Sequence, residues 1–161
     1  MADNKQIAAE GVYEIASPLE GTIIPLNQVK DEVFSGEILG KGVAILPAKG
    51  VLVSPINGVV DSIADSKHAV NLAGDRREEL LIHIGMDTVT LNGKPFTLKV
   101  KEGDRIKIGD ALIEFDIKAI NDAGLDLITP VVITNTGDYK DITVIAGPEV
   151  KAGAPLLKLK A

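Results

Sequence analysis

The sequence of 161 residues lacks cysteine and tryptophan, and only five of its side chains are aromatic. Without cysteine, the chain forms no disulfide, no thiolate metal site and no thiolate nucleophile. It also lacks an apolar run long enough for a membrane span or a signal peptide. We therefore expect a cytoplasmic chain without direct membrane insertion. Because aromatic residues are so few, its interior should be built from Val, Ile and Leu.

Basic charge is also scarce, because 17 Lys and Arg stand against 23 Asp and Glu and the net charge at pH 7 is −6. Such a chain is repelled by phosphate backbones and anionic lipids, which argues against nucleic acid and leaves room for a basic protein partner. The length fits one domain with a real core. We expect residues 1–12 to be a flexible lead and residues 13–161 to be a single domain. The initial Met with a polar lead favours a free-standing chain.

Short runs rich in Val, Ile and Leu recur between Gly, Pro, Asn and Asp residues, which is typical of strands joined by tight turns. The runs are GTIIPL, GVAILP, GVLVSP, NGVVDSI, ELLIHIG, DALIEFD, PVVIT and ITVIAG. They predict an all-β fold, either a β-sandwich or a closed barrel. A short helix is expected at residues 117–124, ending at Gly124, and a second helical turn at residues 94–103.

Two pairs of segments resemble each other within the chain. SPLEGTI at 17–23 is similar to SPINGVV at 54–60, and KEGDRIKIGDALIEFD at 101–116 is similar to VKAGAPLLKLK at 150–160. Either Gly-rich hairpins simply look alike, or the chain contains a duplicated β-motif of the kind found in biotin and lipoate carrier domains. Those carriers need a modifiable lysine beside a methionine, which this chain lacks. A duplication would therefore concern architecture and not chemistry.

The only two histidines, His68 and His83, lie on either side of one short polar loop. The flanking segments HAVNL and EELLIHI have the pattern of strands, and AGDRR between them supplies turn residues. A hairpin with Asp75 and Arg76 as its two loop residues would place His68 directly opposite His83, with both imidazoles on one face. A change of one residue in loop length would put them on opposite faces.

Spacing alone leaves four interpretations of this pair open. In the first, the two histidines are unrelated and half-buried; in the second, they bind zinc, although two ligands are too few for a closed site. In the third, they form an acid–base pair for hydrolysis. In the fourth, one histidine accepts a phosphoryl group while the other stabilises the phosphate. No nucleotide-binding loop supports a kinase, because GEILGKG at 36–42 departs from the phosphate-loop pattern in its spacing and at Gly42. A phosphoryl group would therefore come from another phosphoprotein.

The order of these segments resembles the glucose-family IIA component of the bacterial phosphoenolpyruvate-dependent sugar phosphotransferase system. The resemblance covers about residues 14–160 and is carried by SPLEGTIIPL, VFSGEILGKGVAILPAKGVLVSPINGVV, KHAV and, most specifically, LIHIGMDTV. The details are most similar to the IIA domains of β-glucoside, sucrose and trehalose permeases. The resemblance implies an antiparallel β-sandwich with a shallow site that holds two adjacent histidines.

The resemblance also implies roles for individual residues. His83, within HIGMDTV, matches the histidine that is phosphorylated on Nε2, and His68 matches the neighbour that supports the phosphate and its onward transfer. Ser66 stands where relatives carry a threonine whose hydroxyl orients this neighbour. The remaining matches are an acidic rim and an apolar docking patch beside it. They are Asp31 and Asp87 for the rim, and Val33, Phe34, Ile38 and Leu39 for the patch.

As partners, the resemblance implies HPr as the phosphoryl donor and a cysteine of a IIB domain as the acceptor, in sugar uptake coupled to sugar phosphorylation. No cofactor is required, although an adventitious or partner-shared zinc ion on His68 and His83 stays open. Nε2 of His83 needs a free lone pair, so its Nδ1–H needs an acceptor, and we expect a backbone carbonyl near Gly85. The alternatives are a mainly regulatory module that acts on transporters or kinases, and a zinc-binding protein.

Overall fold

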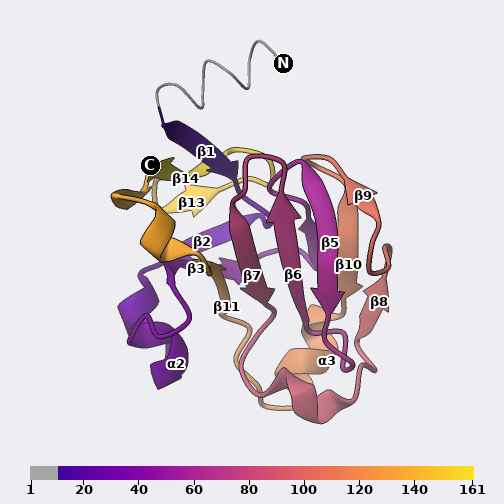
Figure 1. Ribbon diagram of the computed structural model, residues 1–161. Helices are drawn as coiled ribbons and strands as arrows, with labels where there is room; N and C mark the ends of the chain where they lie inside the picture. Colours follow the sequence, from indigo (N-terminus) through magenta and orange to yellow (C-terminus); the bar gives the residue numbers. More distant parts are fainter. Residues whose placement is uncertain (1–10) are drawn as a thin grey trace.

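The computed structural model describes residues 11–161, and strands account for most of its regular structure (Figure 1). In chain order the elements are β1 (Val12–Ala16), β2 (Gly21–Ile24), the 3-10 turn η1 (Leu26–Gln28), α2 (Glu32–Ser35), β3 (Lys41–Pro47), β4 (Val51–Val53), β5 (Gly58–Ile63), β6 (Ala69–Gly74), β7 (Glu79–His83), η2 (Thr88–Leu91), β8 (Phe96–Leu98), β9 (Arg105–Ile106), β10 (Ala111–Phe115), α3 (Ile117–Asp122), β11 (Thr129–Ile133), η3 (Thr136–Asp138), β12 (Asp141–Val144), β13 (Glu149–Val150) and β14 (Pro155–Lys160).

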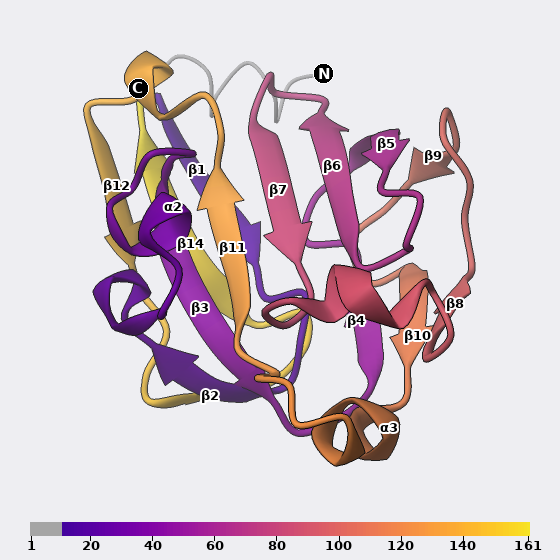
Figure 2. The same ribbon diagram turned by 90° about the horizontal axis from the view of Figure 1, so that it is seen from below.

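The strands form three antiparallel sheets (Figures 1 and 2). The largest has the strand order β13-β2-β3-β11-β7-β6-β5-β9, and the two smaller ones have the orders β1-β14-β12 and β4-β10-β8. One face of the large sheet packs against both small sheets, since all three contribute side chains to one continuous buried cluster. This arrangement confirms the expected antiparallel β-sandwich.

The main core consists almost entirely of Val, Ile and Leu, as the scarcity of aromatic residues predicted. Phe96 and Phe115 are the aromatic side chains buried in it, and their ring centroids are 6.5 Å apart. Alternation along β7 shows how one strand serves both faces of the large sheet: Leu80 and Ile82 are buried in this core, while Leu81 and His83 lie on the other face.

A second, smaller cluster covers part of the outer face of the large sheet, beneath α2 and η1. Its buried members are Leu26, Val29, Phe34, Ala44, Met86 and Val132. Leu81 of β7 packs against it. Figure 2 shows α2 standing over β3 and β11 on this side of the molecule. The cluster therefore anchors the α2 region next to the strand that ends at His83.

The repeated Ser-Pro segments adopt the same local structure. The buried hydroxyl of Ser17 donates to the carbonyl of Leu19 at 2.7 Å, and the buried hydroxyl of Ser54 donates to the carbonyl of Ile56 at 2.6 Å. In both copies the hydroxyl holds the turn that leads into a strand of the large sheet.

The two copies also bond to each other through their backbones. The amide of Ala16 donates to the carbonyl of Pro55, and the amide of Val53 donates to the carbonyl of Pro18, at 3.2 and 2.9 Å. Such a reciprocal exchange is what two copies related by an approximate twofold axis make. The internal similarity is therefore a duplicated motif, as the second of the two sequence interpretations proposed.

The expected helices were partly correct. α3 lies within the predicted segment, Gly124 follows it at φ +78°, and the side chain of Asp116 caps it by accepting from the amide of Ala119. The helical turn expected at 94–103 was wrong, because residues Phe96–Leu98 instead form β8 and pair with β10. Neither α2 nor η2 was predicted.

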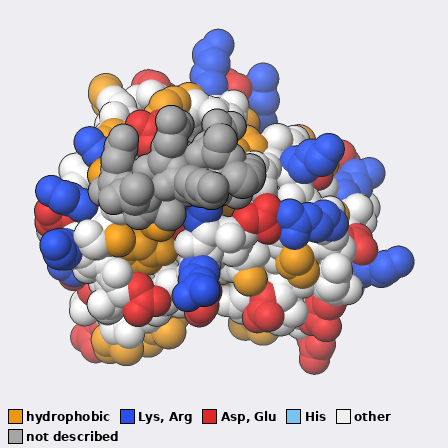
Figure 3. All heavy atoms as spheres, turned by 45° about the horizontal axis from the view of Figure 1, so that its top comes forward, with side chains coloured by type: hydrophobic (Ala, Val, Ile, Leu, Met, Phe, Trp, Pro, Cys, Tyr) orange, Lys and Arg blue, Asp and Glu red, His pale blue; other side chains and the backbone are white. Residues whose placement is uncertain are grey.

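The predicted lead of residues 1–12 falls mostly outside the described residues. At its end the prediction was wrong, because Val12 already belongs to β1 and pairs with Lys160 of β14. On the face around the chain ends, acidic and basic side chains are interspersed with no large area of one sign (Figure 3). Among residues 11–161, no helix has the length and apolarity needed to cross a membrane.

Candidate active site

The β6–β7 hairpin carries both histidines, but its register differs by one residue from the prediction. Ala69, and not His68, lies opposite His83. The loop has three residues and not two, because Arg77 adopts the left-handed conformation at φ +73° and the amide of Gly74 donates to the carbonyl of Glu78 at 2.7 Å. Three-residue hairpin loops that end in a left-handed residue are a common type.

The two imidazoles nevertheless meet, as predicted. Their ring centroids are 4.7 Å apart, and the rings are nearly perpendicular at 82°. His68 precedes β6 and sits in a bend that follows Lys67, which has φ +64°. The alternation of the strand therefore does not extend to His68, and its ring turns towards the face that carries His83.

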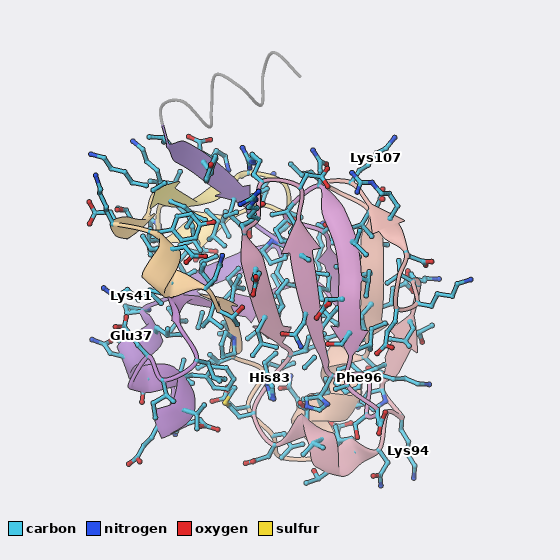
Figure 4. The ribbon with its side chains drawn as sticks, viewed as in Figure 1. Glu37, Lys41, His83, Lys94, Phe96 and Lys107 are labelled. Carbon is cyan, nitrogen blue, oxygen red and sulfur yellow. The ribbon has the colours of Figure 1, made fainter. Side chains whose placement is uncertain are left out.

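The pair lies at one end of β7, on the outer face of the large sheet. Figure 4 places His83 at the end of this strand, between the α2 region with Glu37 and Lys41 on one side and the segment that carries Lys94 on the other. His83 is half-buried, and the ring of Phe34 lies 5.3 Å from its ring, centroid to centroid. The apolar ring of Phe34 thus packs against the imidazole of His83.

One hydrogen bond fixes the protonation of His83. Its Nδ1 lies 2.8 Å from the carbonyl oxygen of Gly85, which can only accept, so Nδ1 carries the proton. Nε2 is therefore left with its lone pair. The backbone acceptor near Gly85 expected from the sequence is confirmed. Gly85 has φ +74°, which turns its carbonyl back towards the ring two residues earlier.

The surroundings of His68 differ from those of His83. His68 is 7% exposed, and its Nδ1 is buried without a hydrogen-bond partner in the described part of the chain. Ser66 therefore makes no hydrogen bond to this ring nitrogen, and the orienting role expected of Ser66 stays a prediction. If Nε2 of His68 carries the proton, the buried Nδ1 has only a lone pair without a partner. The other tautomer would bury an unpartnered N–H group at Nδ1.

Both imidazoles are less basic than a free histidine. Burial lowers the pKa of His68, and the neighbouring His83 lowers it further. Burial also lowers the pKa of His83, against the opposing effects of its hydrogen bond to Gly85 and of the charges of Asp31 and Asp87. The two rings are therefore neutral at pH 7, and Nε2 of His83 is available as a nucleophile.

The two predicted acidic residues lie at the rim of the site. Asp31 is exposed and caps α2, since its carboxylate accepts from the amide of Val33 at 2.9 Å. Asp87 is exposed and left-handed at φ +60°, and its side chain makes no capping hydrogen bond to η2. Both charges act on His83. Asp87 in particular is free to meet a basic group of a partner.

The predicted apolar patch needs one correction. Phe34 is only 4% exposed, because it packs in the smaller cluster and against the ring of His83. It supports the patch from below and is not available for contact. Ile38, at 71%, is the most exposed member, and Val33 and Leu39 are also exposed. Sequence reasoning missed Val89, which is 49% exposed beside Asp87 and belongs to the same LIHIGMDTV segment.

The structure does not supply a complete zinc site. Within residues 11–161 there is no group of three or more His, Cys, Asp or Glu side chains arranged to hold a metal ion. A zinc ion bound to His68 and His83 would need its further ligands from another molecule.

Known proteins are similar to this chain in sequence and in fold. The family described as phosphoenolpyruvate-dependent sugar phosphotransferase system, EIIA 1 matches residues 13–139. The chain belongs to this family. The glucose-specific EIIA component of Oceanobacillus iheyensis is 43% identical over 139 residues, which are 86% of this chain and 84% of that protein. A solved structure of glucose permease IIA from Mycoplasma capricolum has a TM-score of 0.87 and 34% identity, and the match covers 92% of this chain and 96% of that one.

Other relatives of this EIIA chain are longer. The β-glucoside-specific EIIBCA components of Dickeya chrysanthemi and Bacillus subtilis are 47% and 50% identical to it, over 89% and 81% of this chain. The chain spans only 23% and 22% of those two proteins. In these relatives the matching segment is therefore one part of a fused protein.

Proposed function

We propose that this EIIA chain is a phosphocarrier of a sugar phosphotransferase system, which accepts a phosphoryl group on Nε2 of His83 and passes it on. The observation that carries this proposal is the 2.8 Å hydrogen bond from His83 Nδ1 to the Gly85 carbonyl, because it leaves the Nε2 lone pair free beside a second imidazole. Family membership supports the same reading.

In the first step, the lone pair of His83 Nε2 attacks the phosphorus of a phosphohistidine on HPr. The new P–N bond forms as the donor's P–N bond breaks, and the electron pair of the broken bond returns to the donor imidazole. The proton on Nδ1 stays in its hydrogen bond to Gly85. One nitrogen replaces another, so the step depends on in-line placement and on stabilisation of the transferring phosphoryl charge.

In the second step, a thiolate of a IIB domain attacks the same phosphorus, and the P–N bond to His83 breaks. The incoming nucleophile is now an anion, so more negative charge gathers between the two proteins. An N–H donor from His68, whose ring lies 4.7 Å from that of His83, stabilises this charge. The names of the EIIBCA relatives support a IIB partner.

Docking follows from the exposed groups around the pair. Val33, Ile38, Leu39 and Val89 offer an apolar surface, and Asp31 and Asp87 offer negative charge. A partner with an apolar contact surface and a basic residue complements both. The regulatory and zinc-binding alternatives have no separate observation in their favour.

The test uses mass spectrometry after incubation with phosphoenolpyruvate, enzyme I and HPr, followed by single-turnover transfer to a purified IIB domain. The wild type should gain one acid-labile phosphate, and His83→Ala should gain none. His68→Ala should still gain the phosphate but should transfer it to IIB much more slowly, because the nucleophile remains while the stabilising donor is lost.

Two results would contradict these assignments. Uptake of phosphate by His83→Ala at His68 would reverse the assignment of the nucleophile. Equal loss of both steps in His68→Ala would show that the pair acts as one unit. Absence of phosphate in the wild type would overturn the proposed function itself.

A further inference from the structure

One buried threonine stands out in the loop that follows His83. Thr88 opens η2 and is 0% exposed, although Asp87, Val89 and Thr90 around it are all exposed. A buried hydroxyl needs a hydrogen-bond partner. Oγ1 of Thr88 donates to the carbonyl of Ile84, at 2.5 Å, and thereby reaches back across the loop to the residue next to His83.

Thr88 also touches the residue that holds the imidazole. Its methyl carbon lies 2.7 Å from the place where a Cβ on Gly85 would stand, and the carbonyl oxygen of Asp126 lies 2.8 Å from that place on the same residue. The amide of Met86 donates to this same Asp126 oxygen at 2.8 Å. Gly85 is thus enclosed, with Thr88 and Asp126 both in close contact and the peptides before and after it tied by hydrogen bonds.

We infer that Thr88 is a positioning residue for phosphoryl acceptance, which orients the Gly85 carbonyl towards His83 Nδ1 and so keeps the lone pair on Nε2. This inference rests on the proposed function. Between His83 and η2 the backbone is held by the amide of Ile84, which donates to the carbonyl of His68 at 2.7 Å, and by the amide of Met86. The direction of the Gly85 carbonyl therefore depends on a few ties, and the hydroxyl of Thr88 is one of them. In metal-binding histidines, partners that orient the ring through its second nitrogen typically matter by about 10- to 100-fold.

The substitution Thr88→Val removes the hydroxyl, keeps the shape and leaves the Ile84 carbonyl without its partner. We expect the imidazole ¹⁵N shifts of His83 to move from a single Nδ1–H tautomer to a mixture, and the single-turnover rate of phosphorylation by HPr to fall by about tenfold. Thr88→Ser keeps the hydroxyl and should restore the tautomer and most of the rate. If the valine variant does not fold, Thr88→Ala provides the same comparison.

Two matched controls separate positioning from general destabilisation. Thr90→Val removes a similar hydrogen bond, from Oγ1 to the Asp87 carbonyl at 2.7 Å, in the same turn but on an exposed side chain. Ser54→Ala removes a buried hydroxyl that donates to a carbonyl in the duplicated motif. Both should leave the tautomer and the rate unchanged.

An unchanged tautomer in the folded Thr88→Val protein would overturn the inference, as would an equal change in either control. The ¹⁵N measurement is made on the unphosphorylated protein and needs no phosphoryl donor. It therefore still decides the role of Thr88 if the wild type proves unable to accept phosphate, which would be a failure of the proposed function alone.

Discussion

Gly85 provides the sharpest test of how the backbone prepares His83. Its φ of +74° is the left-handed conformation, which costs a residue with a Cβ roughly 1–2 kcal/mol. A Cβ there would also lie 2.7 Å from Thr88 Cγ2 and 2.8 Å from the Asp126 carbonyl oxygen, both inside normal contact distance. Such overpacking typically costs about 1–3 kcal/mol more. We therefore expect Gly85→Ala to lower the free energy of unfolding by roughly 2–5 kcal/mol.

The matched control is Gly103→Ala, because Gly103 has φ +90° but no atom within 4 Å of the place of its Cβ. It should lose only the conformational part, about 1–2 kcal/mol, and keep the wild-type rate of phosphorylation by HPr. Gly85→Ala should lose more stability and accept phosphate at least tenfold more slowly, since its carbonyl no longer meets His83 Nδ1. Urea unfolding and single-turnover phosphorylation measure the two effects. Equal stability losses, or an unchanged rate in Gly85→Ala, would refute the reasoning.

Two further predictions concern charge. Asp87→Lys should slow phosphorylation by HPr, and more so at low salt, because charges act over a longer range when the Debye length is about 30 Å at 0.01 M. The same charge change at Asp141 on β12 should have little effect, and a loss that is independent of salt would contradict a rim role. The pKa of His68 and of His83 lies below 6.5 in the folded state, and is about 6.5 in the unfolded state. At a pH between the folded and the unfolded pKa, the folded state therefore binds fewer protons than the unfolded one. The stability that these two neutral rings contribute is full above about pH 6.5 and is lost as the pH falls through the folded pKa. The rate of phosphate acceptance should fall in that same acidic window as Nε2 of His83 gains a proton, and a pH–rate profile with its midpoint above 6.5 would contradict the lowered pKa.

The strands and the duplication could be predicted from the sequence, because each depends on local sequence patterns. Apolar runs bounded by Gly and Pro gave β3, β5, β7 and β10 to within a residue or two at either end. The Ser-Pro pairs pointed to a repeat, although only the structure shows that the two copies exchange hydrogen bonds. The acceptor for His83 was also predictable, because a glycine two residues after the ring allows its carbonyl to turn back.

The register of the β6–β7 hairpin could not be predicted, because it depends on the conformation of one unusual residue. Arg77 adopts the left-handed conformation, which Gly or Asn normally marks in a sequence. This adds a third loop residue and shifts every pair by one. His68 still reaches His83 because it lies in a bend before β6, next to the left-handed Lys67, although its carbonyl still accepts from the amide of Ile84 at 2.7 Å. Two errors in the strand-based argument therefore cancelled, and the resemblance to the family carried the correct pairing.

The α2 region was missed for a different reason. A helix of four residues has almost no stability of its own, and its sequence EVFS carries no helical period. It forms because Asp31 caps it and because Phe34 is buried beneath it. Tertiary packing decides its structure, and a reading of local pattern cannot supply that.

This packing joins the chemistry of the site to its docking surface. Phe34 lies 5.3 Å from the ring of His83, and burial is the main cause of the lowered pKa of that ring. The same side chain anchors the short helix from which Val33 is exposed, and the chain continues directly to the exposed Ile38. A partner that binds Val33 and Ile38 therefore contacts α2 and the residues that follow it, and Phe34 of α2 packs against the ring of His83. Under the proposed function, the docking surface and the burial of His83 therefore share one side chain, Phe34, which belongs to the smaller cluster and not to the main core.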